Sequence, residues 1–159
     1  MTPPPTDAGS PLQQFGTYFD LALADPLDTR EPAHDADLID RARHLRYEVY
    51  CREFGFEREE DCPGQRESDA WDGRSLHCLL LHHASGRDAG TVRLVLADPA
   101  EPAAPLPFVA HCGASLHADH PAHPARFAPG LCCEVSRLAV GTAFRRRPGE
   151  AESPIGQID

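Results

Sequence analysis

The sequence contains no lysine. All 15 basic residues are arginines, and 25 aspartates and glutamates bring the formal net charge to −10. No basic stripe is present to follow a phosphate backbone, which argues against nucleic acid as the main partner. Together with abundant alanine and proline, the missing lysine indicates the codon usage of a high-GC genome and says nothing about function.

Long apolar runs are also missing. No stretch approaches the roughly 18 apolar residues that a membrane-spanning helix requires. Residues 1–11 have neither the basic nor the apolar region of a signal peptide. We therefore expect a cytoplasmic protein without a transmembrane segment, in which the six cysteines stay reduced.

Nine histidines and six cysteines make a metal-binding domain an alternative to consider. However, the sequence lacks the paired C-x₂-C spacing of a zinc site. His117, His120 and His123 lie in a proline-rich segment, where a solvated cluster is the simpler interpretation. We therefore expect no metal ligands.

The length and a hydrophobic content of 41% fit one globular domain. We expect a disordered leader at 1–12, a folded domain at 13–147 and a polar tail at 148–159, because both ends are polar and rich in proline or glycine.

Hydrophobic periodicity predicts one helix and several strands. The helix begins near Asp35 or Asp37, either of which can cap it, and ends at Phe54–Gly55. Strands are expected at 15–24, 76–83, 90–97 and 132–140, and the second and third of these form an antiparallel hairpin. Residues 98–130 are expected to form a long loop.

The last strand carries two polar residues at an alternating spacing. Glu134 and Ser136 are predicted to share one face with Leu138 and Val140. This pattern fits the solvated face of an edge strand. It also fits a functional site, because polar groups on an apolar strand must be hydrogen-bonded.

Two further features each allow two interpretations. Asp69 and Asp72 belong either to a solvated loop or to a turn that holds a cation or an ammonium group. Arg93 lies in the middle of a strand and either faces solvent or is buried with Asp69, Asp72 or Glu134 as its partner.

Taken together, four segments resemble the acyl-homoserine-lactone synthases and their relatives, the long-chain N-acyl amino acid synthases. The resemblance is strongest to the acyltransferases associated with PEP-CTERM/exosortase systems. It covers about Phe15 to Arg147 and rests on LRYEVYCREFGFE, ESDAWD, GTVRLVL and EVSRLAV, with PLPF and HCG between the last two. These families share a GNAT-like α+β fold with a central mixed, largely antiparallel sheet flanked by helices.

The resemblance implies an N-acyltransferase that moves a fatty-acyl group from a carrier thioester to the amine of a small molecule such as an amino acid. Glu134 would be the general base, and Ser136 would bind the acyl carbonyl or the departing thiol. Glu67, Asp69 and Asp72 match the family's acidic motif. The residues expected to shape the substrate site are Arg46, Tyr50, Phe56, Asp69, Asp72, Arg93 and Arg137.

No tightly bound cofactor is implied; the acyl donor would be acyl-ACP or acyl-CoA. Arg145, Arg146 and Arg147 either meet the carrier phosphate or carrier protein, or form a solvated basic patch. Homoserine-lactone synthases usually have Trp where this chain has Phe56, so the N-acyl amino acid synthases are favoured. Because the family continues past Arg147, the C-terminal part of the fold is expected to be missing. The alternatives are a homoserine-lactone synthase and an inactive interaction module.

Overall fold

The computed structural model describes residues 11–98, 104–117, 119–120, 123, 126 and 132–145. The predicted polar tail, Arg146 and Arg147 lie outside the described residues. So does most of the predicted leader, although its last two residues belong to the first helix, α1 (Pro11–Tyr18).

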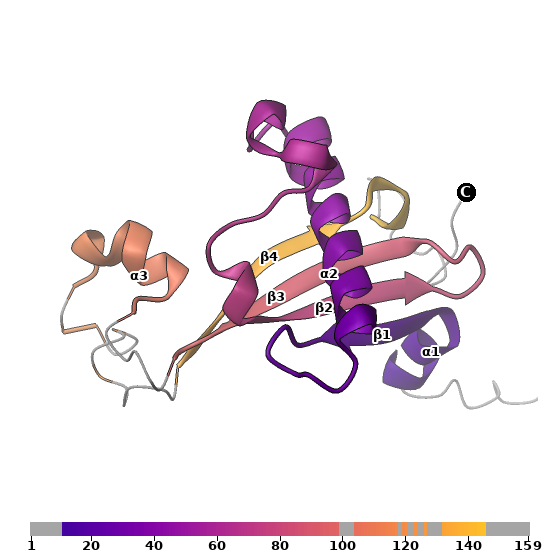
Figure 1. Ribbon diagram of the computed structural model, residues 1–159, viewed down its shortest axis with the longest axis horizontal. Helices are drawn as coiled ribbons and strands as arrows, with labels where there is room; N and C mark the ends of the chain where they lie inside the picture. Colours follow the sequence, from indigo (N-terminus) through magenta and orange to yellow (C-terminus); the bar gives the residue numbers. More distant parts are fainter. Residues whose placement is uncertain are drawn as a thin grey trace, which may run out of the picture.

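A four-stranded antiparallel sheet forms the centre of the domain (Figure 1). Its order is β1-β2-β3-β4, so each strand pairs with the next one along the chain. The strands are β1 (Phe19–Ala24), β2 (Ser75–His82), β3 (Asp88–Leu96) and β4 (Cys133–Val140). This α+β arrangement confirms the predicted fold class, and all described strand pairs are antiparallel.

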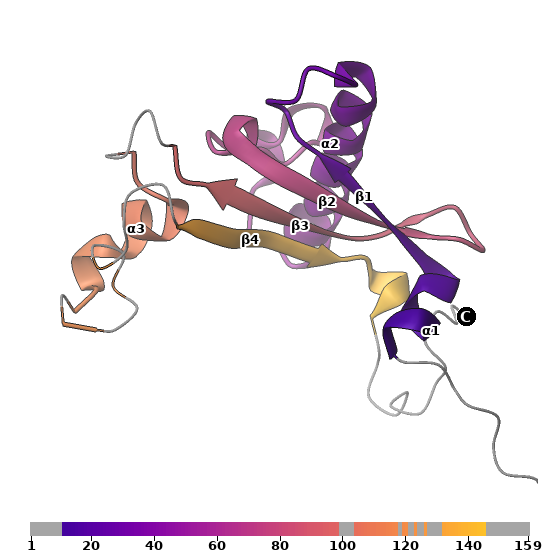
Figure 2. The same ribbon diagram turned by 90° about the horizontal axis from the view of Figure 1, so that it is seen from below.

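Helix α2 (Pro32–Tyr47) lies across one face of the sheet (Figures 1 and 2). Its Leu38, Ile39 and Ala42 pack on Ala24 of β1 and Leu79 of β2. The expected start at Asp35 or Asp37 is wrong. Proline is favoured in the first turn, where its missing N–H is not needed, and the helix therefore begins at Pro32.

The same helix continues as a π-helix, η1 (Glu48–Glu53). It ends with Phe54 as its C-cap and Gly55 at φ +63°. A left-handed residue at this position is the usual glycine stop. The predicted end of the helix is therefore confirmed.

The expected strand at 15–24 is correct only in its second half. Residues up to Tyr18 belong to α1, and the strand begins at Phe19. Phe15 of α1 and Phe19, the first residue of β1, are four residues apart, and their rings stack with centroids 5.0 Å apart. A short apolar run fits both a strand and a helix, and periodicity alone does not separate them.

The expected loop at 98–130 is also partly wrong. It contains α3 (Pro107–Cys112), which starts with a proline and lies beyond the end of the sheet where β4 begins (Figure 1). The described residues also form short 3₁₀ turns at Glu59–Asp61, Pro63–Gln65, Asp72–Arg74, Gly113–Ser115 and Thr142–Phe144.

The sheet face opposite α2 carries exposed apolar side chains. Leu21, Leu23 and Val135 pair with residues that point away from α2, and they are 64–69% exposed. Within the described residues, no helix combines the length and the apolar character needed to cross a membrane.

The sulfur of Cys51, a residue of η1, lies 3.3 Å from the sulfur of Cys62. Both are buried beside Tyr47. Burial, followed by the hydrogen bond between the two thiols, raises the pKa of the Cys51 thiol to about 12. A thiol in this state is a poor nucleophile, because the reacting species is the thiolate.

We therefore expect a thiol reagent to modify the exposed Cys112 and Cys133 first and to leave Cys51 and Cys62 unmodified in the native protein. Mass spectrometry of the modified peptides measures the order, and modification in denaturant is the control in which all six react. Rapid native labelling of Cys51 would contradict the buried arrangement.

Candidate functional site

The centre of the site is the guanidinium of Arg93, which points from β3 toward α2 and is 1% exposed. It binds both oxygens of Asp69, at 2.5 and 2.9 Å, and Oδ1 of Asp72 at 2.6 Å. Its Nε donates to Ser136 Oγ at 3.2 Å. Of the two interpretations of Arg93, the buried ion pair is correct and the outward-facing arginine is excluded.

A second buried guanidinium, that of Arg46, comes from α2 and is also 1% exposed. It donates two hydrogen bonds to Asp72, from Nη1 to Oδ1 at 3.0 Å and from Nη2 to Oδ2 at 2.8 Å. It also donates to the backbone carbonyl of Glu67 at 2.6 Å, and its Nε lies 2.6 Å from Glu67 Oε2. Two planar guanidiniums thus share Asp72, which gives the carboxylate a fixed orientation.

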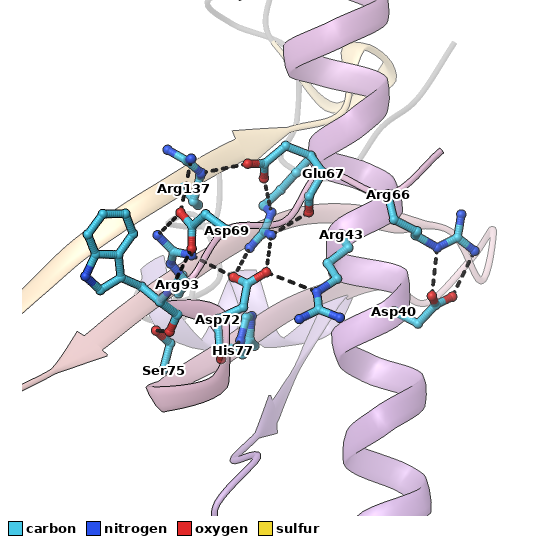
Figure 3. A network of polar contacts seen from close by, with 12 residues as sticks. Asp40, Arg43, Arg66, Glu67, Asp69, Asp72, Ser75, His77, Arg93 and Arg137 are labelled. Carbon is cyan, nitrogen blue, oxygen red and sulfur yellow. Dashed lines mark hydrogen bonds and ion pairs between the residues drawn. The ribbon is translucent and has the colours of Figure 1, made fainter. Parts of the chain in front are cut away.

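Arg137 of β4 completes the set. Its guanidinium contacts Glu67 Oε1 and Asp69 Oδ2, both at 3.1 Å (Figure 3). We call the resulting group the ion-pair clamp: Arg46, Glu67, Asp69, Asp72, Arg93 and Arg137. It joins α2, the acidic segment, β3 and β4, which are far apart in the sequence.

A β-bulge in β4 brings Arg137 into the clamp. Arg93 pairs with Ser136 and Thr91 with Ala139, so Arg137 and Leu138 together lie opposite a single residue of β3. Arg137 has φ +53°, in the left-handed region. The bulge allows Arg137 and Ser136 to contact the same group of side chains although they are adjacent in the strand.

The bulge also corrects the predicted faces of β4. Glu134 and Ser136 do share the face toward α2, as expected, but Leu138 and Val140 do not lie there with them. Val140 pairs with Gly90, which belongs to the opposite face, and Leu138 is 67% exposed. One extra residue shifts the alternation, so the second half of the strand is out of phase with the first.

Glu134 lies at the start of β4, outside the clamp. Its Oε2 accepts a hydrogen bond of 2.7 Å from the backbone N–H of Phe108 in α3. Among the described residues this is its only hydrogen-bonding partner. The carboxylate is therefore held at one oxygen and keeps acceptor capacity at the other.

The clamp sets the protonation of its members. Burial alone would raise the pKa of Asp72, but the hydrogen bonds and charges of Arg46 and Arg93 outweigh it and hold that pKa well below its usual range. Asp69 is affected in the same way, with Arg93 opposing the effect of burial, so its pKa is also lowered. Both carboxyls are thus anionic at neutral pH.

Comparison with known protein families assigns the fold. Residues 45–152 match the model described as acetyltransferase (GNAT) domain, which is more than half of the chain. The chain belongs to the GNAT acetyltransferase family. No curated protein and no solved structure matches it significantly. The GNAT domain is that of an N-acyltransferase, a class that takes its acyl group from acyl-CoA without a tightly bound cofactor. The narrower exosortase-associated group stays a prediction.

Two further residues that were predicted for the site of this GNAT domain, Tyr50 and Phe56, lie in different surroundings. The hydroxyl of Tyr50 donates to the carbonyl of Leu138 at 2.9 Å and so reaches the bulge of β4. Phe56 is 72% exposed and stacks on Phe54, so the structure does not bring its ring to the clamp. Its role in substrate binding stays a prediction.

Arg145, one of the three arginines expected at a carrier phosphate, is bound by Glu53 and lies over the ring of Phe54. A cleft of about 430 Å³ opens nearby, lined by residues that include Glu53, Arg87 and Thr142. In the described part of the chain, no three His, Cys, Asp or Glu side chains are placed to hold one metal ion.

Two residues of the site escaped the sequence analysis. Arg43 contacts Asp72 Oδ2 at 3.0 Å, and its position three residues before Arg46 on the same helix was the available signal. The Nε2 of His77 lies 3.1 Å from the carbonyl of Asp72. Burial lowers the pKa of His77. His77 was one of three histidines in the expected strand 76–83, and nothing in the pattern separated it from the other two.

Replacing Arg93 by Ala is expected to destabilise the domain by about 3–5 kcal/mol, because Asp69 and Asp72 lose a buried partner. Chemical unfolding measures this change. The matched control is Arg66→Ala, whose partly exposed pair with Asp40 should contribute under about 1 kcal/mol. Equal stability of Arg93→Ala and wild type would show that the clamp is not a structural support.

Stability should fall in two steps on acidification. Because the pKa of His77 is lowered from 6.5, the unfolded chain binds this proton first, and stability is lost below about pH 6.5. The pKa values of Asp69 and Asp72 are lowered from 3.8. Their contribution is therefore complete above about pH 4 and is lost as the pH falls further.

Urea unfolding of wild type and His77→Gln across this range tests the first step. The glutamine can still donate to the Asp72 carbonyl but does not titrate. Wild type should therefore lose stability relative to the variant as the pH falls. A pH-independent difference between the two proteins would contradict the assignment to His77.

Proposed function

We propose that this GNAT domain transfers a fatty-acyl group from a carrier thioester to the amino group of a small molecule such as an amino acid. The observation that carries the proposal is the placement of Glu134 and Ser136 on one face of β4, next to the ion-pair clamp. The resemblance of the four sequence motifs to N-acyl amino acid synthases supports the choice of acyl group and acceptor.

The reaction is aminolysis of a thioester. Glu134 accepts a proton from the acceptor ammonium, and the neutral amine attacks the thioester carbonyl. The C–N bond forms and the C–S bond breaks. The attacking nitrogen gives up a second proton, which the departing thiolate takes up, so the products are an amide and the free thiol of the carrier.

Ser136 is suited to assist at the acyl carbonyl. Its oxygen already accepts from Arg93 Nε, which leaves its own O–H to donate. A donor held in place by a buried guanidinium is preorganised, and such donors stabilise the oxyanion that develops during attack.

The buried arginines are unsuited to bind substrate directly, because Arg46 and Arg93 are enclosed and form ion pairs within the clamp. Arg137 is 29% exposed, and among the described residues its Nη1 has no hydrogen-bonding partner. Within the clamp, Arg137 is therefore the candidate to bind the carboxylate of an amino acid acceptor. Glu67 and Asp69 hold it directly. Arg46, Asp72 and Arg93 support these two carboxylates from within the clamp.

Glu134→Gln is expected to reduce acyl transfer by about a hundredfold or more, because the amide cannot accept the proton. The assay uses acyl-CoA and acyl-ACP with an amino acid, and mass spectrometry identifies the product. The control is Glu60→Gln, an exposed glutamate paired with Arg58. Full activity of Glu134→Gln would remove Glu134 from the role of base.

The same product analysis separates the candidate reactions. An N-acyl amino acid supports the proposal, whereas an acyl-homoserine lactone as the product would replace it. Absence of turnover with every donor and acceptor would contradict the proposed activity of this chain.

A further inference from the structure

The 105–111 segment, which surrounds the start of α3, is attached to the turn that follows the acidic motif. Arg74 donates from Nη2 to the carbonyl of Pro105 at 2.7 Å. The indole Nε1 of Trp71 donates to the same carbonyl at 3.4 Å. The ring of Trp71 also meets that of His111 edge-on, with centroids 5.4 Å apart.

Three residues beyond Pro105, the same segment holds the proposed base. The N–H of Phe108 donates to Glu134 Oε2 at 2.7 Å. The intervening backbone has little freedom, because Pro107 fixes its own φ and restricts the residue before it. The position of the Pro105 carbonyl is therefore transmitted to the Phe108 amide.

The turn that carries Trp71 and Arg74 is itself held by the clamp. The backbone N–H of Trp71 donates to Asp69 Oδ1 at 2.9 Å. The hydroxyl of Ser75 donates to the Trp71 carbonyl at 2.6 Å, and the N–H of Arg74 donates to the same carbonyl at 3.1 Å. A continuous series of contacts thus runs from Asp69 through Trp71 and Arg74 to the 105–111 segment.

We propose that Arg74, with Trp71, is a positioning residue that fixes the carboxylate of Glu134 through the backbone of residues 105–108. The inference rests on the proposed role of Glu134. Arg74 does not reach the reacting atoms. It acts by holding the Phe108 amide, and so one oxygen of Glu134, in the orientation that leaves the other oxygen for the acceptor amine.

The test compares Arg74→Ala, Arg74→Lys and the control Arg66→Ala. Arg66 has the same side chain and lies just before the acidic motif that Arg74 follows, but it pairs with Asp40 and contacts the carbonyls of Gly64 and Gln65. Two quantities are measured for each protein: the steady-state constants for acyl transfer, and the exchange rate of the Phe108 amide hydrogen.

Arg74→Ala is expected to lower kcat about tenfold with a smaller change in KM, since a misplaced base affects the chemical step. Exchange of the Phe108 amide should become faster. Lysine can still donate to the Pro105 carbonyl, so Arg74→Lys should recover most of kcat. Arg66→Ala should behave as wild type in both measurements.

If Arg74→Ala does not fold, Trp71→Phe replaces it, because phenylalanine keeps an aromatic ring against His111 and removes the indole donor. Unchanged Phe108 exchange would overturn the proposal. Faster exchange with an unchanged kcat would overturn it as well, because Arg74 would then hold the segment without influencing the reaction.

Failure of the proposed function gives a different result. In that case Glu134→Gln keeps full activity, or no transfer occurs at all, which removes the role of Glu134. The exchange measurement does not depend on turnover. Faster Phe108 exchange in Arg74→Ala would still show that Arg74 holds the contact with Glu134.

Discussion

The domain depends on how two guanidiniums are accommodated away from water. Arg46 and Arg93 come from the helix and from the central sheet, and both are 1% exposed. An unpaired charge in such a place would cost several kcal/mol. Asp69, Asp72 and Glu67 supply the compensating charge, and the segment that carries them is consequently fixed between α2 and β4. Every other feature of the site is placed relative to this segment.

The bulge in β4 connects the clamp to the residues proposed to contact the substrate. In a regular strand, Ser136 and Arg137 would point to opposite sides of the sheet. With two residues opposite one, Ser136 binds Arg93 while Arg137 binds Glu67 and Asp69. The hydroxyl and the partly exposed guanidinium are thereby supported by the same acidic residues, and this joint support is the basis of the proposed oxyanion and carboxylate contacts.

Much of the fold was predictable from the sequence, and the errors in the prediction have identifiable causes. The hairpin of β2 and β3 followed from two apolar runs on either side of a glycine turn, in which Gly86 has φ +64°. The split of 15–24 into helix and strand was missed because its aromatic residues suit either structure. The helix within 98–130 was missed because prolines and histidines obscure its short apolar pattern.

The site, like the fold, was only partly predictable from the sequence. Local sequence determined the types of residue, an acidic cluster, two arginines at mid-element positions and a Glu-x-Ser pair, because each belongs to a short motif. It also indicated that Arg93 needs a carboxylate partner if it is buried, since burial of an unpaired charge is unfavourable.

Only the tertiary structure decided which carboxylate binds which arginine, that Leu138 leaves the face of Glu134, and that a backbone amide of α3 holds that glutamate. These contacts join residues between 21 and 70 positions apart in the chain. A single left-handed residue at Arg137 determines the phase of half a strand, and nothing in the alternation of side chains records that conformation.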